Sequence, residues 1–588
     1  MNFIELININ PNFSSIFGLT VLIWNYLFCY KFSLNFKILN NEILNFILFN
    51  ILFYLILSPI LLLFLFLKIE LILIKILIYF LFIFQLFYFF YNKRLNLKKF
   101  NYFNKFDYLI IFFLTLFTFS QVTDADSLDY HLGGVIEIIR NNGLILRNDE
   151  WYHFRLIGLG EMINFYGLIF YSKNFGQLFQ VLAFSNIILI FKLVNKNLKL
   201  NYLILTSFPL FGSIILSAKQ LLIVTNCYLL VFITLLFNFQ LSKKIFFALI
   251  VLIIAPIGFK HSYIIYSVPI WIYLGFFSKN NINLFKYIKY STLIFLLVPF
   301  IVFFKNFFYY GDPVSPFLEF LKENPDIDIL NFAKELRYST KIFNIWEFFI
   351  IPFKHFVPIN LNEISLLLSP TILAFYFIYF CKKDKNLSIL LITIYCLLFF
   401  SGKSQSRYYL DLYLLSALIF LFNFKLDRFK KSMIYVSLSM IPYSFLTIGI
   451  ILYSITTLSY PSLNKKDFEK VMNLKANDYE IIMWINDKIK ENEKVFYDES
   501  IRSKTYQKHN FVYYKKFPKS NIELKNIIED NEIDKIVLSK DIFEQKIEAN
   551  YKCDIINKKP FHRATRNPIN IKKNIAIIYI LDSRCLKW

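Results

Sequence analysis

The sequence predicts an α-helical polytopic membrane protein with a small α/β domain at its C-terminal end. Hydrophobic residues make up 57% of the 588 positions, and the mean hydropathy is +0.50. Values this high over so long a chain are typical of proteins with many membrane spans. From residue 461 onward charged residues become frequent and the apolar runs shorten, which indicates a separate domain outside the membrane.

The apolar runs set the expected number of helices. Because about twenty apolar residues cross the hydrocarbon layer as a helix, the runs predict about fourteen transmembrane helices, some short enough to be half-spans. The first run lacks the pattern of a cleaved signal peptide, and we expect it to be retained. The expected spans are 15–34, 43–67, 69–92, 106–122, 175–193, 201–218, 219–240, 245–258, 262–277, 290–305, 365–381, 387–401, 407–424 and 433–458.

Basic residues gather in short segments that all fall on one side of this arrangement. Cytoplasmic loops carry an excess of Lys and Arg, so this side is predicted to be cytoplasmic. The long polar segments 123–174, 306–364 and 461–588 fall on the other side. The basic segments are 31–37, 92–105, 192–199, 241–244, 278–289, 381–385 and 425–431.

The net charge of +23 follows from these loops. A nucleic-acid-binding surface would instead show a basic stripe interleaved with stacking aromatic residues, and no such stripe is evident outside the predicted spans. We therefore expect no nucleic-acid partner.

An acidic segment, "TDADSLDYH", follows the fourth predicted span. It places Asp124, Asp126, Asp129 and His131 at the expected outer surface of the membrane. Apolar residues then recur at helical spacing up to Gly143, which predicts an amphipathic helix in the interface. In this interpretation Asp126 is the N-cap and Asp129 complements the helix dipole. Asp124 has no such structural role, which makes it the stronger candidate for chemistry.

The segment that follows, 147–163, carries many further charges and aromatic residues. Most of them are expected to form a solvated loop with Trp and Tyr at the interface. Arg155 and Glu161 have apolar neighbours, and we expect them to face a partner or a cavity.

Two other outer segments contain candidate cations. Lys260 lies in "GFKHSY" between two predicted spans, where it either extends toward the membrane surface or binds an anion. Arg407 begins a late span, one helical turn before Asp411. The two either form an ion pair, or Arg407 joins Lys260 in binding a phosphate group.

The C-terminal region predicts alternating helices and strands. Residues 477–493 and 521–532 have helical periodicity, and 494–499 and 533–540 are typical of strands. This alternation predicts a small α/β domain, without a Gly-rich phosphate loop. Cys553 and Cys585 lie in this domain, and a disulfide between them is one option that the sequence leaves open.

Four features together resemble a known family. They are "TDADSLDYH" in an early outer loop ahead of an interfacial helix, "YYGDPVSPF" at 309–317 in a later outer loop, Arg407 and Tyr408 at the start of a late span, and Lys260 in mid-chain. This set is similar to the GT-C superfamily of polytopic glycosyltransferases, which includes protein mannosyltransferases and the aminoarabinose transferases of lipid A. An outer C-terminal α/β domain is also common in that family.

The resemblance implies a function and a donor. A sugar would pass from a polyprenyl-phosphate-linked donor to a hydroxyl of a glycan, lipid or protein acceptor, outside the bacterial inner (plasma) membrane. Asp124 or Asp126 would act as catalytic base, or both would hold a Mg²⁺ or Mn²⁺ ion, which the resemblance allows without requiring. The family more often has an adjacent acidic pair, so the choice between the two stays open. The implied substrate- or phosphate-binding residues are Asp129, His131, Arg155, Lys260, Arg407 and Tyr408.

The resemblance also implies a domain division. About three helices precede the acidic loop in addition to the single span that is usual in the family. We therefore expect an added N-terminal module over 1–105 and a GT-C-like core over 106–460 with outer loops 123–174 and 306–364. An extracytoplasmic α/β domain is expected over 461–588.

Two other functions fit the composition. A transporter or flippase of lipid-linked sugars predicts internal repeats and ionisable residues near mid-span, and neither is evident. A non-catalytic membrane protein of envelope assembly would use the acidic segment only structurally. Catalysis requires the segment from Asp124 to Asp129 to face Lys260 and Arg407 across one cavity, which a structure can decide.

Overall fold

A computed structural model gives the structure of the protein. It describes residues 11–91, 102–147, 149, 151–237, 242–277, 284–337, 345–358, 361–373, 385–403, 405–423, 430–497, 501, 503–514, 517–518, 520–555, 557–563 and 574–587.

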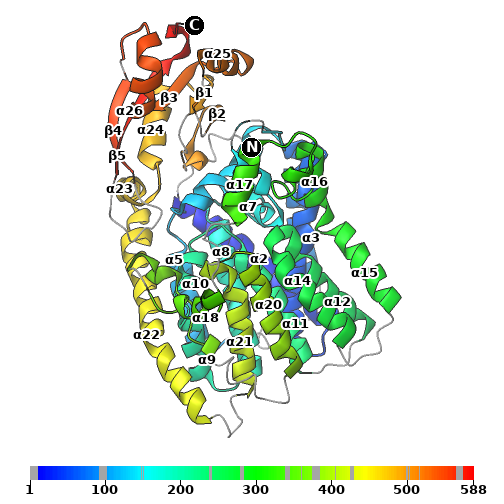
Figure 1. The fold of residues 1–588 in the computed structure, drawn as a ribbon. Coiled ribbons are helices and arrows are strands. Elements are labelled where there is room, and N and C mark those ends of the chain that lie inside the picture. The colour runs from blue at the N-terminus through cyan, green and yellow to red at the C-terminus, as the bar shows by residue number, and fades with distance from the viewer. Residues whose placement is uncertain are drawn as a thin grey trace.

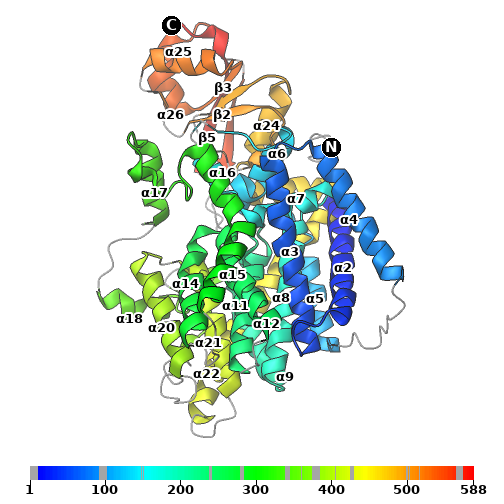
Figure 2. The same cartoon turned by 90° about the vertical axis from the view of Figure 1, so that its right-hand side faces the viewer.

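Apolar helices form a bundle that makes up most of the chain (Figures 1 and 2). Its N-terminal half contains α2 (Pro11–Asn35), α3 (Glu42–Phe66), α4 (Leu71–Tyr91), α5 (Lys105–Phe117), α6 (Gly133–Arg140), α7 (Leu159–Ile169), α8 (Phe175–Val194), α9 (Leu198–Thr206), α10 (Leu210–Ile215), α11 (Leu221–Leu236), α12 (Lys243–Ile254) and α13 (Pro256–Phe259). Its C-terminal half contains α14 (Ile264–Ile272), α15 (Leu284–Leu297), α16 (Phe300–Tyr310), α18 (Ile345–Lys354), α20 (Lys385–Phe400), α21 (Leu410–Asn423) and α22 (Lys430–Ser454). The more polar helix α17 (Ile327–Arg337) stands beside the bundle (Figure 2).

Several of these helices are suited to cross a membrane. Among the described residues, α2, α3, α4, α8 and the helix that begins at Ile434 within α22 are long and apolar enough, and α15 with α16 forms a pair bent by 53° that would add a sixth span. The shorter apolar helices α11, α20 and α21 lie in the same bundle. The protein is therefore an integral membrane protein. The expected span 365–381 lies outside the described residues from position 374 onward.

Prolines divide some of the runs that the sequence predicts as single spans. Pro209, Pro256 and Pro299 stand at the starts of α10, α13 and α16. A proline lacks the amide hydrogen that a helix interior donates, so the hydrogen-bond ladder is interrupted and a helix restarts at each site.

The two ends of the bundle differ. The C-terminal domain, α17 and the start of α2 lie at one end, while α9 and the start of α22 lie at the other (Figures 1 and 2). The described parts of the basic segments next to α9 and α22 therefore lie at the end opposite the C-terminal domain, as the topology prediction requires. We call the end that carries the domain the domain end.

The predicted outer loops contain more helix than expected. α7 lies within 123–174, and all of its residues are buried. α18 lies within 306–364 but packs against α20 and α21, where the Tyr395 hydroxyl donates to the Phe348 carbonyl and the Tyr413 hydroxyl to the Pro352 carbonyl. An apolar helix is more stable against the bundle than in a solvated loop.

The C-terminal domain is a five-stranded sheet with helices, in the strand order β2-β1-β3-β5-β4. Strands β1, β2 and β3 are parallel, and β5 runs antiparallel to both β3 and β4. The predicted helices and strands up to residue 540 are confirmed, whereas β2, β4 and β5 were not expected. The elements are α23 (Lys465–Lys475), α24 (Tyr479–Lys488), β1 (Val495–Tyr497), β2 (Phe511–Tyr513), α25 (Asn521–Asp530), β3 (Lys535–Ser539), α26 (Lys540–Ile542), β4 (Asn557–Arg563) and β5 (Asn574–Asp582). A disulfide joins Cys553 to Cys585.

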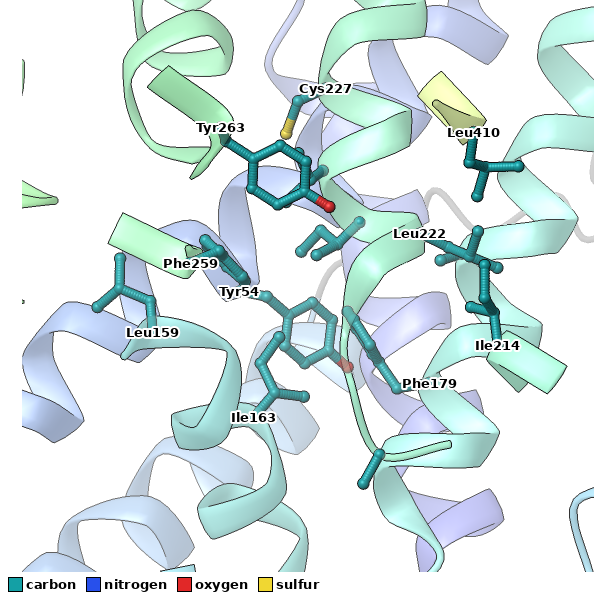
Figure 3. Packing of buried hydrophobic residues seen from close by; sticks show 14 of the residues in the cluster. Tyr54, Leu159, Ile163, Phe179, Ile214, Leu222, Cys227, Phe259, Tyr263 and Leu410 are labelled. Atoms are coloured by element: carbon teal, nitrogen blue, oxygen red, sulfur yellow. The ribbon is translucent and has the colours of Figure 1, made fainter. Parts of the chain in front are cut away.

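The core of the bundle is continuous up to its domain end. Figure 3 shows Tyr54 of α3, Ile163 of α7 and Phe179 of α8 close together, and the rings of Tyr54 and Phe179 are 4.4 Å apart between centroids. Phe259 and Tyr263 belong to the same cluster and also line a cavity. Part of the cavity wall therefore belongs to the closely packed core of the bundle.

Candidate active site

A cavity lies at the domain end of the bundle, where loops from four parts of the chain meet. It has an empty volume of about 700 Å³, part of it open to the surroundings. Its lining combines three cations with aromatic and aliphatic side chains, which fits a ligand that is anionic at one end and apolar at the other. The lining residues are Tyr130, His131, Gly160, Glu161, Lys219, Gln220, Leu221, Phe259, Lys260, Ser262, Tyr263, Ile265, Tyr266, Leu398, Arg407 and Tyr408.

The acidic segment begins a helical turn, but Asp124 rather than Asp126 caps it. Asp124 Oδ1 accepts a hydrogen bond of 3.1 Å from the Ser127 amide, and the Asp124 carbonyl accepts from Leu128. Asp126 is itself helical and makes no capping hydrogen bond. The prediction that Asp126 is the N-cap is therefore wrong. The helix starts two residues earlier, which leaves the Asp126 carboxylate to face other partners.

Lys219 joins both aspartates. Its ammonium lies 3.2 Å from Asp124 Oδ1 and 3.1 Å from Asp126 Oδ2. The sequence interpretation did not select this lysine, which is the first residue of the predicted span 219–240. A lone lysine between apolar runs on the expected outer side, where basic residues are few, was the available signal.

Arg407 completes an ion cluster with these residues. Its guanidinium Nη1 lies 3.3 Å from Asp126 Oδ2, so Asp126 contacts two cations. The Lys219 ammonium, together with Arg407 and against the effect of burial, holds the pKa of the Asp126 carboxyl well below its usual range. Asp126 is therefore a stable anion and a weak proton acceptor. The alternative pair between Arg407 and Asp411 is not formed, because Asp411 accepts from the Thr225 hydroxyl at 2.5 Å.

Cations also surround the ring of Tyr408. The Lys260 and Lys403 ammonium groups each lie 5.0 Å from its centroid, and the Arg407 guanidinium carbon lies 5.4 Å from it. The Lys260 ammonium, with Arg407 and Lys403 and against the effect of burial, lowers the pKa of Tyr408 to about 7. A positive potential strong enough to ionise a phenol also attracts a phosphate group.

His131 and Glu161 form a second polar pair on the cavity wall. His131 Nδ1 lies 2.6 Å from Glu161 Oε1, and Glu161 Oε2 accepts a 2.7 Å hydrogen bond from the Gly158 amide. The imidazole packs on the ring of Tyr130 at 4.0 Å between centroids. Both carboxylate oxygens are thus used, and the orientation of the imidazole is fixed.

Buried amide groups hold these loops together. The Asn164 amide on α7 donates to the His131 carbonyl and to the Ala218 carbonyl, each at 3.0 Å, and accepts from the Gln220 amide at 2.9 Å. A Cβ atom on Gly176 would collide with both amide groups, so glycine is needed there. The acidic segment and the Lys219 loop are therefore fixed relative to each other through α7.

Two predicted ligand residues lie away from the cavity. Asp129 is fully buried and forms an ion pair with Lys504 of the C-terminal domain, and His153 Nδ1 lies 3.5 Å from it. Arg155 donates to the Ser315 hydroxyl at 3.3 Å and lies 4.3 Å from the Tyr310 ring centroid. Arg155 therefore has the partner that was expected of it, within the "YYGDPVSPF" segment.

Arg147, Asp149 and Trp151 form an interdomain contact and not a solvated loop. Arg147, Asp149 and Trp151 are buried, and Arg147 pairs with both Asp149 and Glu137. The Tyr513 amide donates to Asp149 at 3.0 Å. The prediction of a solvated loop is wrong for these three residues, because the C-terminal domain covers them.

The two aspartates do not fit a divalent metal ion in this arrangement. The Lys219 ammonium lies between their carboxylates, where a bridging cation would have to be. Across the described ranges no group of three or more His, Cys, Asp and Glu side chains is placed to hold a metal. The lysine supplies positive charge at this position.

The fold and the site define the protein as an integral membrane protein whose helical bundle has a polar cavity at one end. The chain belongs to the DUF1420 family: the model described as the DUF1420 N-terminal domain matches residues 74–472. Comparison with curated proteins gives no significant match.

Two solved structures are similar to the chain. The structure of ArnT from Cupriavidus metallidurans bound to undecaprenyl phosphate matches with 10% identity and a TM-score of 0.47, over 82% of this chain and 97% of that chain. The apo structure of the same protein matches with 10% identity and a TM-score of 0.48, over 80% and 96%. An identity of 10% and TM-scores below 0.5 carry no functional inference, so a function for this chain has to be argued from its own residues.

Proposed function

We propose that the protein is a membrane glycosyltransferase that takes a sugar from a polyprenyl-phosphate-linked donor and transfers it to an acceptor hydroxyl. The observation that carries this proposal is the convergence of Lys219, Lys260 and Arg407 on one cavity. They come from three separate loops at the end of an apolar bundle.

The cations match the chemistry of the leaving group. When the bond between the sugar and the phosphate breaks, negative charge develops on the phosphate oxygens. Prepositioned cations in a partly dry cavity stabilise that charge more strongly than water does. Arg407 can bind two phosphate oxygens at once, and the two lysines add point charges.

The apolar wall of the cavity matches the carrier. Leu221, Ile265 and Leu398 line it beside the cations. A polyprenyl phosphate has an anionic head and a long hydrocarbon chain, so its head would bind the cations while its chain lies along apolar side chains toward the lipid.

Asp124 and Asp126 have a defined part in this proposal. They hold Lys219, and Asp126 also holds Arg407, so these cations stay in place before the donor binds. Such preorganisation avoids a rearrangement at the moment of reaction. Replacing either aspartate with Asn is therefore expected to lower the rate of sugar transfer, because the cations are no longer held in place.

The proposal is tested in the cells that make the protein by comparing deletion, Lys219→Ala and Arg407→Ala strains. We expect mass spectrometry to detect a lipid-linked sugar that accumulates in all three and is lost from a surface glycan, lipid or protein. Each substitution is expected to reduce transfer by about 10²-fold, the usual effect of losing one group that stabilises transition-state charge. Lys525→Ala, at an exposed site in the C-terminal domain, serves as control.

The same strains separate the alternatives. A transporter defect leaves the lipid-linked sugar protected from a membrane-impermeant oxidant added outside, whereas a transferase defect leaves it accessible. If no lipid-linked sugar accumulates in the deletion strain, the glycosyltransferase proposal is wrong and a role in envelope assembly gains support.

A further inference from the structure

We propose that His131, oriented by Glu161, is the general base that deprotonates the acceptor hydroxyl. This inference rests on the proposed glycosyl transfer and assigns the proton-accepting step to a residue other than the two aspartates.

The geometry leaves one imidazole nitrogen for a ligand. Nδ1 is held by Glu161 Oε1 at 2.6 Å, and His131 lines the cavity. A carboxylate next to Nδ1 favours the tautomer with its hydrogen on that atom, so Nε2 keeps a lone pair. Within the described part of the chain, no hydrogen bond is made by Nε2.

The carboxylates near the cations are less suited to accept the proton. Asp126 contacts Lys219 and Arg407, and Asp124 contacts Lys219 and the Ser127 amide. Taking a proton would weaken these contacts at the moment when the cations are needed by the phosphate. His131 contacts a carboxylate instead, and Glu161 and the nearby Asp126 both stabilise the imidazolium that forms.

The step balances without a further reactant. The acceptor O–H gives its proton to His131 Nε2 while its oxygen forms a bond to the anomeric carbon. The bond from that carbon to the phosphate oxygen breaks, and its electron pair stays on the phosphate, beside Lys219, Lys260 and Arg407. The imidazolium afterwards releases the proton to water.

Glu161 is a positioning residue in this scheme. It does not touch the substrate and acts by fixing the imidazole. The Gly158 amide in turn fixes Glu161. Because α7 also carries Asn164, which bonds the His131 carbonyl, one helix sets both the ring and the backbone of His131.

The test uses the full chain in lipid nanodiscs and the lipid-linked sugar that accumulates in cells lacking the protein. We expect His131→Ala to lower the rate of carrier phosphate release by about 10²- to 10⁴-fold, the usual contribution of a general base. Binding of undecaprenyl phosphate, used as the probe, is expected to stay within about twofold. Added imidazole is expected to restore part of the rate, because a small base can fill the space left by the ring.

Matched variants separate chemistry from structure. Glu161→Gln is expected to lower the rate with unchanged probe binding. His261→Ala removes a neighbouring imidazole that does not line the cavity, and its rate is not expected to respond to imidazole. If His131→Ala keeps the wild-type rate, or binds the probe normally but gains nothing from imidazole, His131 is not the base. If the wild-type protein neither binds the probe nor releases the carrier, the proposed function itself fails.

Discussion

Single residues at the cavity show how position sets chemistry. Asp124 and Asp126 are the same residue type two positions apart, yet one caps a helical turn and the other pairs with Arg407. The difference follows from where the helix begins. Because the helix begins two residues earlier than predicted, Asp124 has the capping role that was expected of Asp126, and Asp126 is left to pair with cations.

Tyr408 predicts a pH dependence of phosphate binding. Its pKa is lowered to about 7 chiefly by Lys260. A phosphate that binds the same cations competes with the tyrosinate and raises the pKa of Tyr408, so binding above pH 7 takes up a proton. Affinity for undecaprenyl phosphate should therefore be full below pH 7 and fall by up to about tenfold per pH unit above it.

Binding titrations in nanodiscs between pH 6.5 and 9 check this dependence, with Tyr408→Phe as the control that lacks the phenol. The slope should be smaller in the variant. Equal slopes in both proteins would show that Tyr408 does not titrate in this range.

At the scale of elements, the cations of the cavity come from breaks in apolar runs. Lys219 lies between α10 and α11, and Lys260 lies between α13 and α14. A charged side chain within a membrane-spanning helix is costly, whereas at a loop near the bundle end it can meet a counter-ion and water. The breaks thus place charge where the chemistry needs it.

The acidic segment is also tied to the C-terminal domain. Asp129 is 1% and Lys504 4% exposed, and they form a buried ion pair. Removing one residue of the pair takes away the short ion-pair contact of a buried charge, so Asp129→Asn and Lys504→Met should each lower the free energy of unfolding by about 3–5 kcal/mol. The double variant should lose less than the sum, as measured by unfolding of the purified protein in detergent.

Lys525→Ala provides the comparison. Lys525 faces Glu529 across 3.7 Å on an exposed helix surface, and exposed pairs contribute little, so its effect should stay within about 0.5 kcal/mol. Additive single effects at Asp129 and Lys504 would contradict direct coupling between the two residues.

For the whole molecule, the orientation in the membrane is predicted from the basic segments next to α9 and α22, which lie at the end of the bundle opposite the C-terminal domain. The positive-inside rule places the end near α9 in the cytoplasm and the C-terminal domain outside. The disulfide between Cys553 and Cys585 agrees with an oxidising compartment. A membrane-impermeant maleimide should label Lys525→Cys in intact cells, and Lys196→Cys only after the membrane is opened.

The unmodified chain measures background labelling, because among the described free cysteines Cys29 and Cys227 are buried but Cys396 is partly exposed. Labelling of Lys196→Cys but not Lys525→Cys in intact cells would reverse the orientation and place the cavity on the cytoplasmic side.

The sequence by itself determined the helical membrane class, the separate C-terminal domain and the segment that carries the acidic cluster. Long apolar runs and clustered basic loops are local properties, because each reflects only the transfer of nearby residues into lipid or water. Lys260, Arg407 and Tyr408, which the sequence proposed together as phosphate-binding residues, line one cavity.

Only the tertiary structure decided which charges meet. Lys219 contacts both Asp124 and Asp126. Asp129 forms an ion pair with Lys504, and His131 pairs with Glu161. These pairs join positions tens to hundreds of residues apart. These pairs form because a buried charge is costly unless an opposite charge or a hydrogen-bonding group contacts it. Which groups meet depends on how the helices and domains pack in three dimensions. Local sequence patterns do not record that packing.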